Sequence, residues 1–532
     1  MISSIYIKNF RSIKELELFP KSLSALLGPN STGKTNVLKA IDLVLGEGWT
    51  TKAKIARELF NNPDEAIEIE ITFKSPIKVP GAGYPTGDLD VSSIKLEMTL
   101  TPELSVNTTI NGGAKFYAQE KFKKLCHFIY IPSQRDLADQ MRVSGWTLLG
   151  KMMKEIHSNY ISTYVGGEPQ LKNDLKDRMQ SAKDFIENDF DPTLVTFKKF
   201  VDSFKKHCQK NSIGLANKFE PELNIYNLNW FYKTLQIQVT ENNDKIFDAE
   251  DLGSGLQNLI LISIFQTYAE LMGGKVIFGI EEPEIFLYPQ AQRSLYESFQ
   301  ELSKVTQIFY TTHNPNFVSA NRAHELEILH KNDELGTFVT DKDDTVITEP
   351  FLKEKQYQIY SHFNSHRNEL FFAKKILLVE GPSDKILFET LAKEKWAIDL
   401  NKEGISIIDC TGKTGVLYFT GVCKLLGLDY LSVWDKDDEV TPTILAEAIN
   451  SSNGLELDKD LETILQAKYT TLSFSSDSSK KIKQAYDWAI STMDWPSEFE
   501  QVRNFMIPTE SEDKTTEDQD VFNVITIDEI PF

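Results

Sequence analysis

The sequence predicts an α/β protein in which one α/β domain is interrupted by an inserted helical region and followed by a second α/β domain. Three observations carry this prediction. A short apolar run near the N-terminus leads into a glycine-rich loop, and matching runs far downstream end in polar residues. Charged segments with helical spacing lie between these parts, over residues 141–215. Three more strand patterns, each followed by a polar turn, come after residue 374.

Length and composition are those of an ordinary globular protein. The 532 residues are enough for about three domains. No apolar run reaches the roughly 18 residues of a membrane helix, the N-terminus lacks a signal-peptide layout, and the four cysteines form no CxxC pair. We therefore expect a cytoplasmic protein without membrane contact. The net charge of −21 argues against nucleic-acid binding by the whole surface, but it permits a local basic groove.

A phosphate-binding loop follows the first of these strands. The apolar run Leu23–Leu27 leads into GPNSTGKT, residues 28–35, and a helical pattern comes next. This is the pattern G-x-x-x-x-G-K-[ST] between a strand and a helix. We expect backbone N–H groups around Gly33 to surround a phosphate, Lys34 to reach the β- and γ-phosphate oxygens, and Thr35 to bind Mg²⁺. The loop predicts a nucleotide site.

Two downstream strands can complete that site. The segment KVIFGIEEPEIFLYP ends its strand in Glu281, which can hold Mg²⁺, and Glu282, which can polarise the attacking water. The segment QIFYTTHNP delivers His313 to a loop where it can sense a γ-phosphate. A lone histidine is more often structural, but the order of the motifs favours the functional interpretation.

A Gly-Ser-Gly triplet begins an amphipathic helix upstream of Glu281. Gly253, Ser254 and Gly255 lie at its N-terminus, where backbone N–H groups can bind an anion. An ordinary capped helix explains the triplet equally well when it is considered alone.

About 250 residues separate Lys34 from Glu281, which is more than a minimal nucleotide domain needs. Residues 141–215 therefore form an inserted helical hairpin or small bundle. Its apolar stripe predicts dimerisation, or packing on its own domain, and consists of Leu194, Phe197, Phe200, Val201 and Phe204.

These motifs together resemble the ATPase head of the SMC/RecF-like class. The resemblance rests on IYIKNFRSIKELEL, the phosphate loop, EEPEIFLYP and TTHNP. It implies that Arg11 and Asn30 face the nucleotide. The triplet is similar to the signature motif of ABC-type ATPases, which completes the site of the opposite subunit and implies a homodimer or higher homo-oligomer around two ATPs. The usual Q-loop glutamine has no counterpart, because no glutamine precedes Gln119.

The strands after residue 374 predict a second, acidic site. LLVEGPSD, GISIIDCTGKTGV and LDYLSVWDKDDE each end a strand in polar residues, so these residues meet at one sheet edge. The carboxylates at this edge are Glu380, Asp384, Asp435 and Asp437. Clustered carboxylates repel one another unless cations lie among them, and hard oxygen ligands favour Mg²⁺ or Mn²⁺ over zinc. Such a cluster suits phosphodiester chemistry, although any single aspartate could simply cap a strand end.

The acidic motifs resemble the Toprim fold, and a Toprim domain behind an SMC/RecF-like ATPase is the arrangement of the OLD (overcoming lysogenization defect) family. The resemblance implies that the four carboxylates act as metal ligands or general base. It adds Glu462 as a further acid and one of Lys480, Lys481 or Lys483 as a transition-state lysine. A topoisomerase would need a strand-passing domain, and a primase would usually bring a zinc module; the sequence has neither.

Two functions stay open at this stage. The first is an ATP-regulated, metal-dependent DNA endonuclease that acts in bacterial anti-phage defence, with a helicase or a reverse transcriptase and its DNA product as partner. The second is an ATP-driven DNA clamp or sensor whose Toprim site binds nucleic acid without cutting it. We expect an ATPase domain over 1–140 and 216–365, the helical dimerisation region over 141–215, the Toprim domain over 366–500 and an acidic tail over 501–532.

Overall fold

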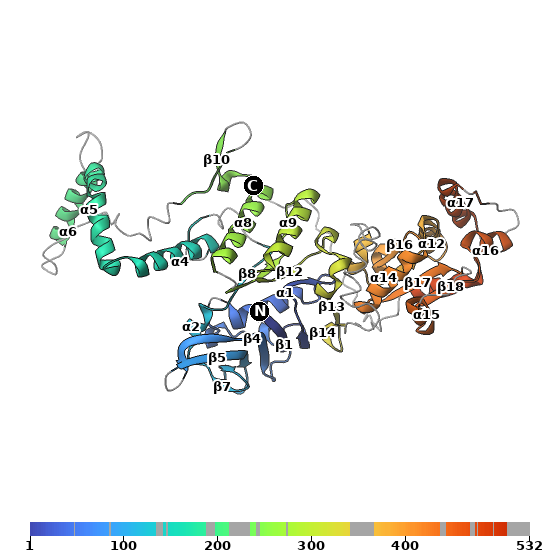
Figure 1. The fold of residues 1–532 in the computed structure, drawn as a ribbon, viewed down its shortest axis with the longest axis horizontal. Helices are drawn as coiled ribbons and strands as arrows, with labels where there is room; N and C mark the ends of the chain where they lie inside the picture. Colours follow the sequence, from blue (N-terminus) through green and yellow to red (C-terminus); the bar gives the residue numbers. More distant parts are fainter. Residues whose placement is uncertain are drawn as a thin grey trace, which may run out of the picture. The chain divides into compact units, whose positions relative to one another are not determined.

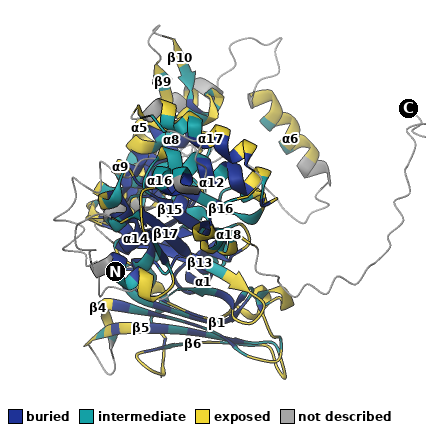
Figure 2. Cartoon of the chain, turned by 90° about the vertical axis from the view of Figure 1, so that its right-hand side faces the viewer, coloured by how far each residue is buried: buried dark blue, intermediate teal, exposed yellow. Residues whose placement is uncertain are grey.

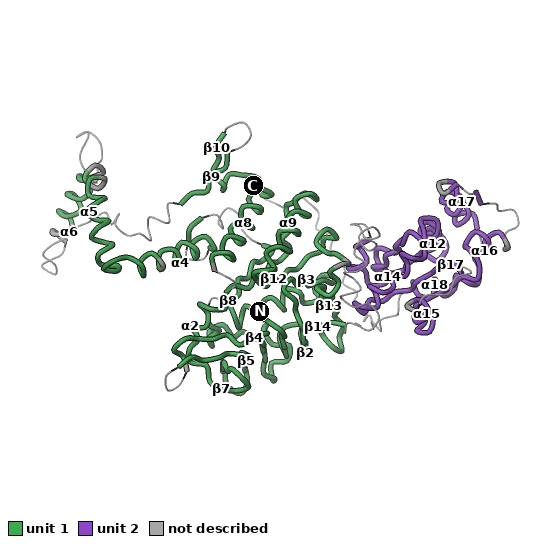
Figure 3. The backbone as a smooth tube through the Cα atoms, in the orientation of Figure 1, with its two compact units in different colours: residues 1–340 green, residues 341–532 purple. Residues whose placement is uncertain are grey.

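The computed structural model contains two compact units, residues 1–340 and residues 341–532 (Figure 3). It describes residues 1–46, 48–83, 87–134, 142–144, 147–187, 197–211, 235–240, 245–272, 275–340, 367–436, 443–468, 474–475, 477–492 and 494–507. No helix within these ranges combines the length and apolar character needed to cross a bilayer.

Within its described residues, the first unit is built on one mixed sheet of twelve strands in the order β7-β6-β5-β4-β1-β2-β14-β13-β3-β12-β11-β8 (Figure 1). The strands are β1 (Ile2–Phe10), β2 (Ile13–Leu18), β3 (Leu23–Leu27), β4 (Ile67–Gly83), β5 (Gly87–Thr99), β6 (Ser105–Ile110), β7 (Ala114–Lys115), β8 (His127–Ile131), β11 (Val276–Glu281), β12 (Gln307–Thr311), β13 (Leu326–Asn332) and β14 (Gly336–Val339). Strands β13, β3, β12, β11 and β8 pair in parallel, whereas the pairs formed by β1, β2, β4, β5, β6 and β14 are antiparallel.

Burial separates the two halves of this sheet. Every residue of β3, β11 and β12 is buried, as expected for parallel strands that are covered on both faces. Strand β2 instead alternates between buried and exposed residues, because one of its faces meets solvent. The helices of this unit are α1 (Lys34–Leu45), α2 (Gln119–Lys123), α4 (Leu148–Thr163), α5 (Gly167–Glu187), α6 (Phe197–Asn211), α8 (Ser254–Met272) and α9 (Pro289–Leu302). A two-stranded hairpin consists of β9 (Gln238–Thr240) and β10 (Ile246–Asp248).

The predicted insertion contains α4, α5 and α6. Helix α6 is largely exposed along the chain drawn in Figure 2. Phe200 and Phe204 are 51% and 42% exposed, and their rings lie 5.8 Å apart on one face of α6. Leu194 and the side chain of Phe197 lie outside the described residues. Of the described part of the predicted stripe, Phe200 and Phe204 are therefore exposed to solvent in the single chain, whereas Val201 is half-buried.

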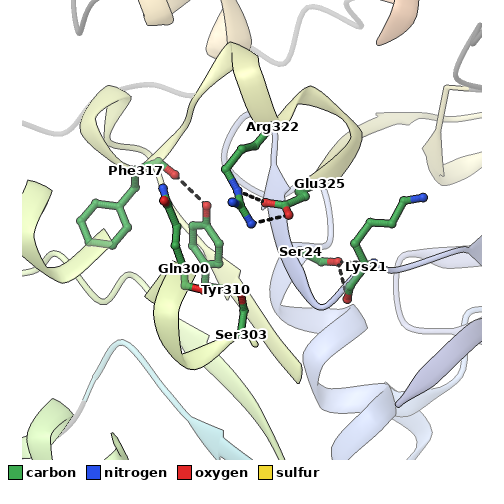
Figure 4. Close-up of polar contacts among 8 residues, drawn as sticks. All are labelled: Lys21, Ser24, Gln300, Ser303, Tyr310, Phe317, Arg322 and Glu325. Carbon is green, nitrogen blue, oxygen red and sulfur yellow. Dashed lines mark hydrogen bonds and ion pairs between the residues drawn. The ribbon is translucent and has the colours of Figure 1, made fainter. Parts of the chain in front are cut away.

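The connection from β12 to β13 is fixed by buried polar contacts (Figure 4). The hydroxyl of Tyr310 donates to the carbonyl of Phe317 at 2.7 Å. Arg322 donates to both carboxylate oxygens of Glu325, at 2.6 and 2.5 Å. Fixing this segment matters because it follows directly on the loop that carries His313.

The second unit is a four-stranded parallel sheet, in the order β16-β15-β17-β18 among its described residues. Its strands are β15 (Lys375–Val379), β16 (Ile405–Asp409), β17 (Tyr430–Asp435) and β18 (Gly454–Leu457). Its helices are α12 (Pro382–Glu394), α13 (Leu400–Glu403), α14 (Lys413–Leu425), α15 (Thr443–Asn450), α16 (Leu461–Lys468), α17 (Ser478–Ser491) and α18 (Glu500–Met506). Because all four strands run the same way, the residues that follow their carboxyl ends meet at one edge.

Candidate ATP site and acidic site

The phosphate loop joins β3 to α1 and requires glycine at its last bend. Gly33 has a φ of 103°, and a Cβ there would lie 2.5 Å from Oγ1 of Thr337. Thr337 in turn shares a hydrogen bond of 2.7 Å with the hydroxyl of Ser12, which accepts from the amide of Asn36 at 2.8 Å. The loop therefore lies directly against β14, with no room for a side chain between them.

Lys34 is held inside this loop. Its Nζ atom donates to the carbonyl oxygens of Gly28 and Pro29, each at 2.8 Å, and its side chain is almost wholly buried. Burial lowers the pKa of Lys34 to about 8, although the charges of Glu282 and Glu281 raise it. This mutual influence shows that the structure brings the lysine and the two glutamates together. Thr35 follows in the first turn of α1 and is half-buried.

The two glutamates come from the end of β11, two strands away from β3. Glu281 is 6% exposed, and one of its carboxylate oxygens accepts from the backbone N–H of Ser133 at 3.1 Å. Burial, with the charge of Glu281, raises the pKa of the neighbouring Tyr130. Glu282 has a φ of 43°, and its N–H donates to the carbonyl of Thr311 on β12 at 3.0 Å. This turn directs Glu282 out of the strand and leaves it half-buried.

His313 lies on the exposed loop after β12. The protein around it removes part of its hydration, which lowers the pKa of the imidazole; the charge of Lys34 lowers it further, and Glu282 raises it. The structure therefore brings His313 into the electrostatic range of the predicted ATP site.

Arg11 and Asn30 are the two positions inferred from resemblance alone. Arg11 is half-buried, adopts a φ of 53° and is fixed through its backbone, whose N–H donates to the carbonyl of Leu59 at 2.8 Å. Asn30 is exposed on the phosphate loop. No described contact joins either side chain to the carboxylates of the site, so their roles stay predictions.

The triplet Gly253–Gly255 begins α8 as predicted. Gly253 and Ser254 are exposed, and no atom lies within 4 Å of a Cβ built on Gly253. A Cβ on Gly255 would instead approach the carbonyl of Phe286 to 3.0 Å. The triplet can therefore be reached by a molecule from outside the chain.

The acidic edge of the second unit is assembled by backbone hydrogen bonds. A carboxylate oxygen of Glu380 accepts from the N–H of Asp435 at 2.8 Å, which links the ends of β15 and β17. Asp384 lies one turn into α12 and accepts from the N–H of Gly381 at 2.9 Å. Asp384 thus caps its helix while its carboxylate faces the cluster. Asp437 lies outside the described residues.

Burial and like charges act together at this edge. Burial is the main cause that raises the pKa of Asp384 to about 7, and the charges of Glu380 and Glu462 act in the same direction. Burial also raises the pKa of Asp435 to about 8, with Asp384 and Glu380 as the next causes. Within the described ranges, no three His, Cys, Asp or Glu side chains already converge at metal-binding distance. The carboxylates are close enough to repel one another, and oxygen donors of this kind fit Mg²⁺ or Mn²⁺.

The structure distinguishes between the three candidate lysines on α17. Lys481 Nζ lies 2.9 Å from a carboxylate oxygen of Glu462, and its charge lowers the pKa of Asp384. Lys483 pairs instead with Asp487 on its own helix, and Lys480 is exposed. Lys481 is therefore the lysine that faces the acidic cluster.

Two nearby acids were not identified from the sequence. Asp460 accepts from the N–H of Thr463 at 2.6 Å at the start of α16, and its charge raises the pKa of Asp435. Glu284, in the first unit, is buried beside the His313 loop. Both are acids close in sequence to predicted site residues, which is the signal that could have marked them.

The sequence matches two protein families. Residues 1–84 and 87–318 match the AAA ATPase domain, and residues 371–437 match the overcoming lysogenization defect protein-like TOPRIM domain. The chain is similar to the OLD nuclease of Thermus scotoductus, with 27% identity over 82% of each chain. It is also similar to the Old nuclease of Escherichia phage P2, with 22% identity over 90% of this chain and 86% of that one. The endonuclease GajA of Bacillus cereus is 23% identical over 74% of this chain and 68% of its own.

These matches confirm the predicted family, the predicted α/β fold class and the prediction that the chain is an enzyme. The ATPase match includes the phosphate loop and the Glu281 strand, and the TOPRIM match includes β15, β16 and β17. The chain belongs to the AAA ATPase domain family, and behind this ATPase domain it carries a segment that matches the OLD-like TOPRIM domain.

Proposed function

We propose that this enzyme is an ATP-regulated, metal-dependent endonuclease that nicks or cleaves DNA. The observation that carries the proposal is the carboxylate cluster at the edge of the TOPRIM sheet, where Asp384 and Asp435 have strongly raised pKa values and Lys481 lies close by. Carboxylates forced together in this way favour divalent cations, and phosphodiester hydrolysis needs cations at such a site.

Each side chain of the cluster has a separate task in this proposal. Glu380, Asp384 and Asp435, with Asp437 beyond the described residues, would hold Mg²⁺ or Mn²⁺. A cation bound there neutralises charge on the scissile phosphate and makes bound water easier to deprotonate. Glu462 orients Lys481 through their 2.9 Å ion pair, and Lys481 binds a non-bridging phosphate oxygen. The backbone bonds to Glu380 and Asp384 keep these carboxylates in place.

The ATP site controls this reaction in the proposal. Lys34 and Thr35 bind the phosphates and Mg²⁺, Glu281 supports the metal, and Glu282 polarises the attacking water. The exposed Gly253–Gly255 triplet completes the site of a second copy, so we infer a homodimer or higher oligomer. Phe200 and Phe204 on α6 supply apolar surface for a second contact between copies. Light scattering that finds a monomer at micromolar concentration, with and without ATP, would contradict the role of the triplet.

Anti-phage defence, with a helicase or a reverse transcriptase and its DNA product as partner, is the biological role that the family resemblance supports. A role in defence implies that the enzyme acts in the cytoplasm, where phage DNA is present. Deletion of the gene together with its neighbours should raise the plating efficiency of at least some phages. Unchanged plating across a broad phage panel would contradict this role.

The decisive experiment incubates the purified chain with supercoiled plasmid and Mg²⁺ or Mn²⁺, with and without ATP, beside Lys34→Ala. Cutting by the parent chain supports the endonuclease, whereas DNA binding without cutting supports the alternative, an ATP-driven clamp or sensor. Loss of cutting in Lys34→Ala would mean that ATP licenses the nuclease. Unregulated cutting would mean that ATP restrains it.

A further inference from the structure

The segment after β11 carries a third glutamate that the ATPase scheme above does not use. Glu284 is 8% exposed, which is unusual for a glutamate that has no cationic partner among the described residues. One of its carboxylate oxygens accepts from the hydroxyl of Thr312 at 2.5 Å and from the backbone N–H of His313 at 3.3 Å. The other oxygen is buried and has no hydrogen-bond partner among the described residues. Burying a carboxylate oxygen without a hydrogen bond costs free energy, so the position of Glu284 needs a physical explanation.

The contacts of Glu284 join two loops that come from different strands. The first loop follows β11 and includes Glu282, and the second follows β12 and includes His313. Thr312 is fully buried, and its hydroxyl also accepts from the N–H of Asn314 at 2.9 Å. The carboxylate therefore holds the backbone at His313 from one side while Thr312 holds the same turn from the other.

The backbone around Glu284 is itself anchored to α8. The amide of Asn258, which is fully buried, donates to the carbonyl of Pro283 at 2.8 Å and to that of Ile285 at 3.1 Å. The two carbonyls belong to the residues immediately before and after Glu284. The helix that begins with the Gly253–Gly255 triplet thus fixes the glutamate, and the glutamate fixes the histidine loop.

We propose that Glu284 is a positioning residue of the ATP site, whose carboxylate locks the His313 loop to the Glu282 turn so that the two side chains keep one geometry. The proposal rests on the proposed ATPase function and adds a residue to it. Glu284 touches no nucleotide in this scheme, because its bonds go to Thr312 and to the backbone of His313. Misplacing a catalytic group by about 1 Å can cost roughly a hundredfold in rate, which is the scale of effect to expect.

The test compares three substitutions in the full chain. Glu284→Met keeps the volume but removes the acceptor, so the kcat for ATP hydrolysis should fall about ten- to a hundredfold with little change in KM. Glu284→Gln keeps an acceptor oxygen for Thr312 and His313 and should retain most of the parental rate. Thr312→Val removes the donor, and combining it with Glu284→Met should cost little more than either change alone.

A matched control lies just before β12, at the opposite end of this strand from Thr312. The buried hydroxyl of Thr306 donates to the carbonyl of Val276, away from the site, so Thr306→Val removes a comparable bond. It should leave the kcat unchanged. A Glu284→Met variant that hydrolyses ATP at the parental rate would overturn the proposal, as would a Gln variant as slow as the Met variant or additive effects in the double variant. A parent chain that hydrolyses no ATP would instead overturn the proposed ATPase function.

Discussion

The ATP site and the acidic TOPRIM edge both gather carboxylates at the ends of parallel strands, but their charges are balanced differently. The positive charge of Lys34 interacts with Glu282 and Glu281, so that site already contains a cation from the chain. At the TOPRIM edge, Asp384 and Asp435 face further carboxylates, with Lys481 at the border. The first site therefore has part of its counter-charge from the chain itself. The second lacks a counter-charge that a divalent cation would supply.

The largest expected effect comes from removing a carboxylate of the TOPRIM cluster. Asp435→Ala removes a proposed metal ligand that its neighbours cannot replace, so cleavage should fall by roughly a thousandfold or more while ATP hydrolysis continues. Plasmid nicking and phosphate release, measured on the same preparation, check both parts. Asp458→Ala is the control, because this side chain is 95% exposed and only loosely paired with Lys436. Parental nicking by Asp435→Ala under Mg²⁺ and Mn²⁺ would refute the nuclease assignment of this cluster.

The next largest effect comes from removing a carboxylate of the candidate ATP site. Glu282→Gln keeps the shape of the side chain but removes the carboxylate that we propose polarises the attacking water, so ATP hydrolysis should fall by about a hundredfold or more. Nucleotide binding, measured by fluorescence titration, should be retained. Glu301→Gln on the surface of α9 should behave like the parent chain. If Glu282→Gln hydrolyses ATP normally, another residue is the base.

A smaller effect tests Lys481, whose charge acts on Asp384 at the TOPRIM edge. Lys481→Ala should lower the cleavage rate roughly ten- to a hundredfold, as expected for losing one charge-assisted contact to phosphate. Lys483→Ala, on the same helix but paired with Asp487, should have no effect on the cleavage rate. Equal losses in the two variants would show that α17 contributes general positive charge and no specific contact.

The smallest effect is a dependence of stability on pH. The raised pKa values of Asp384 and Asp435 mean that the metal-free folded chain holds protons that the unfolded chain releases. Its stability should therefore fall as pH rises from about 4 towards the folded values of about 7 and 8. Mg²⁺ replaces those protons, so the increase in melting temperature that it causes should grow over the upper part of the same range. A metal-induced shift that is independent of pH would contradict the clustered arrangement.

The sequence predicted those parts of the fold that local pattern controls. The strand before the phosphate loop and the strand ending at Glu281 agree with β3 and β11. Strand β18 was missed because GLEL is short and its residues alternate weakly between buried and half-buried. The long β4–β5 hairpin carries no motif and was not anticipated.

The strand order predicted which of the candidate site residues lie close together. Parallel strands place Glu380 and Asp435 at one edge, so their proximity follows from the pattern. The choice of Lys481 over Lys480 or Lys483 depends on how α17 is rotated against α16, and adjacent lysines do not reveal this. Glu284 belongs to the motif EEPEIFLYP, but the sequence does not distinguish it, because its contacts are with the loop after β12, which comes later in the sequence.

The contact between Gly33 and Thr337 has a consequence for how the ATPase unit is closed. The phosphate loop belongs to the earliest part of this unit, whereas β14 is its last strand, after which the chain continues into the second unit. Ser12, Asn36 and Thr337 fasten these two ends of the unit to each other by hydrogen bonds. The predicted nucleotide site therefore lies where the beginning and the end of the domain are bonded to each other. A truncation just before β14 would leave every nucleotide motif intact in the sequence, but it would remove Thr337 and with it the hydrogen bond to Ser12 beside the phosphate loop.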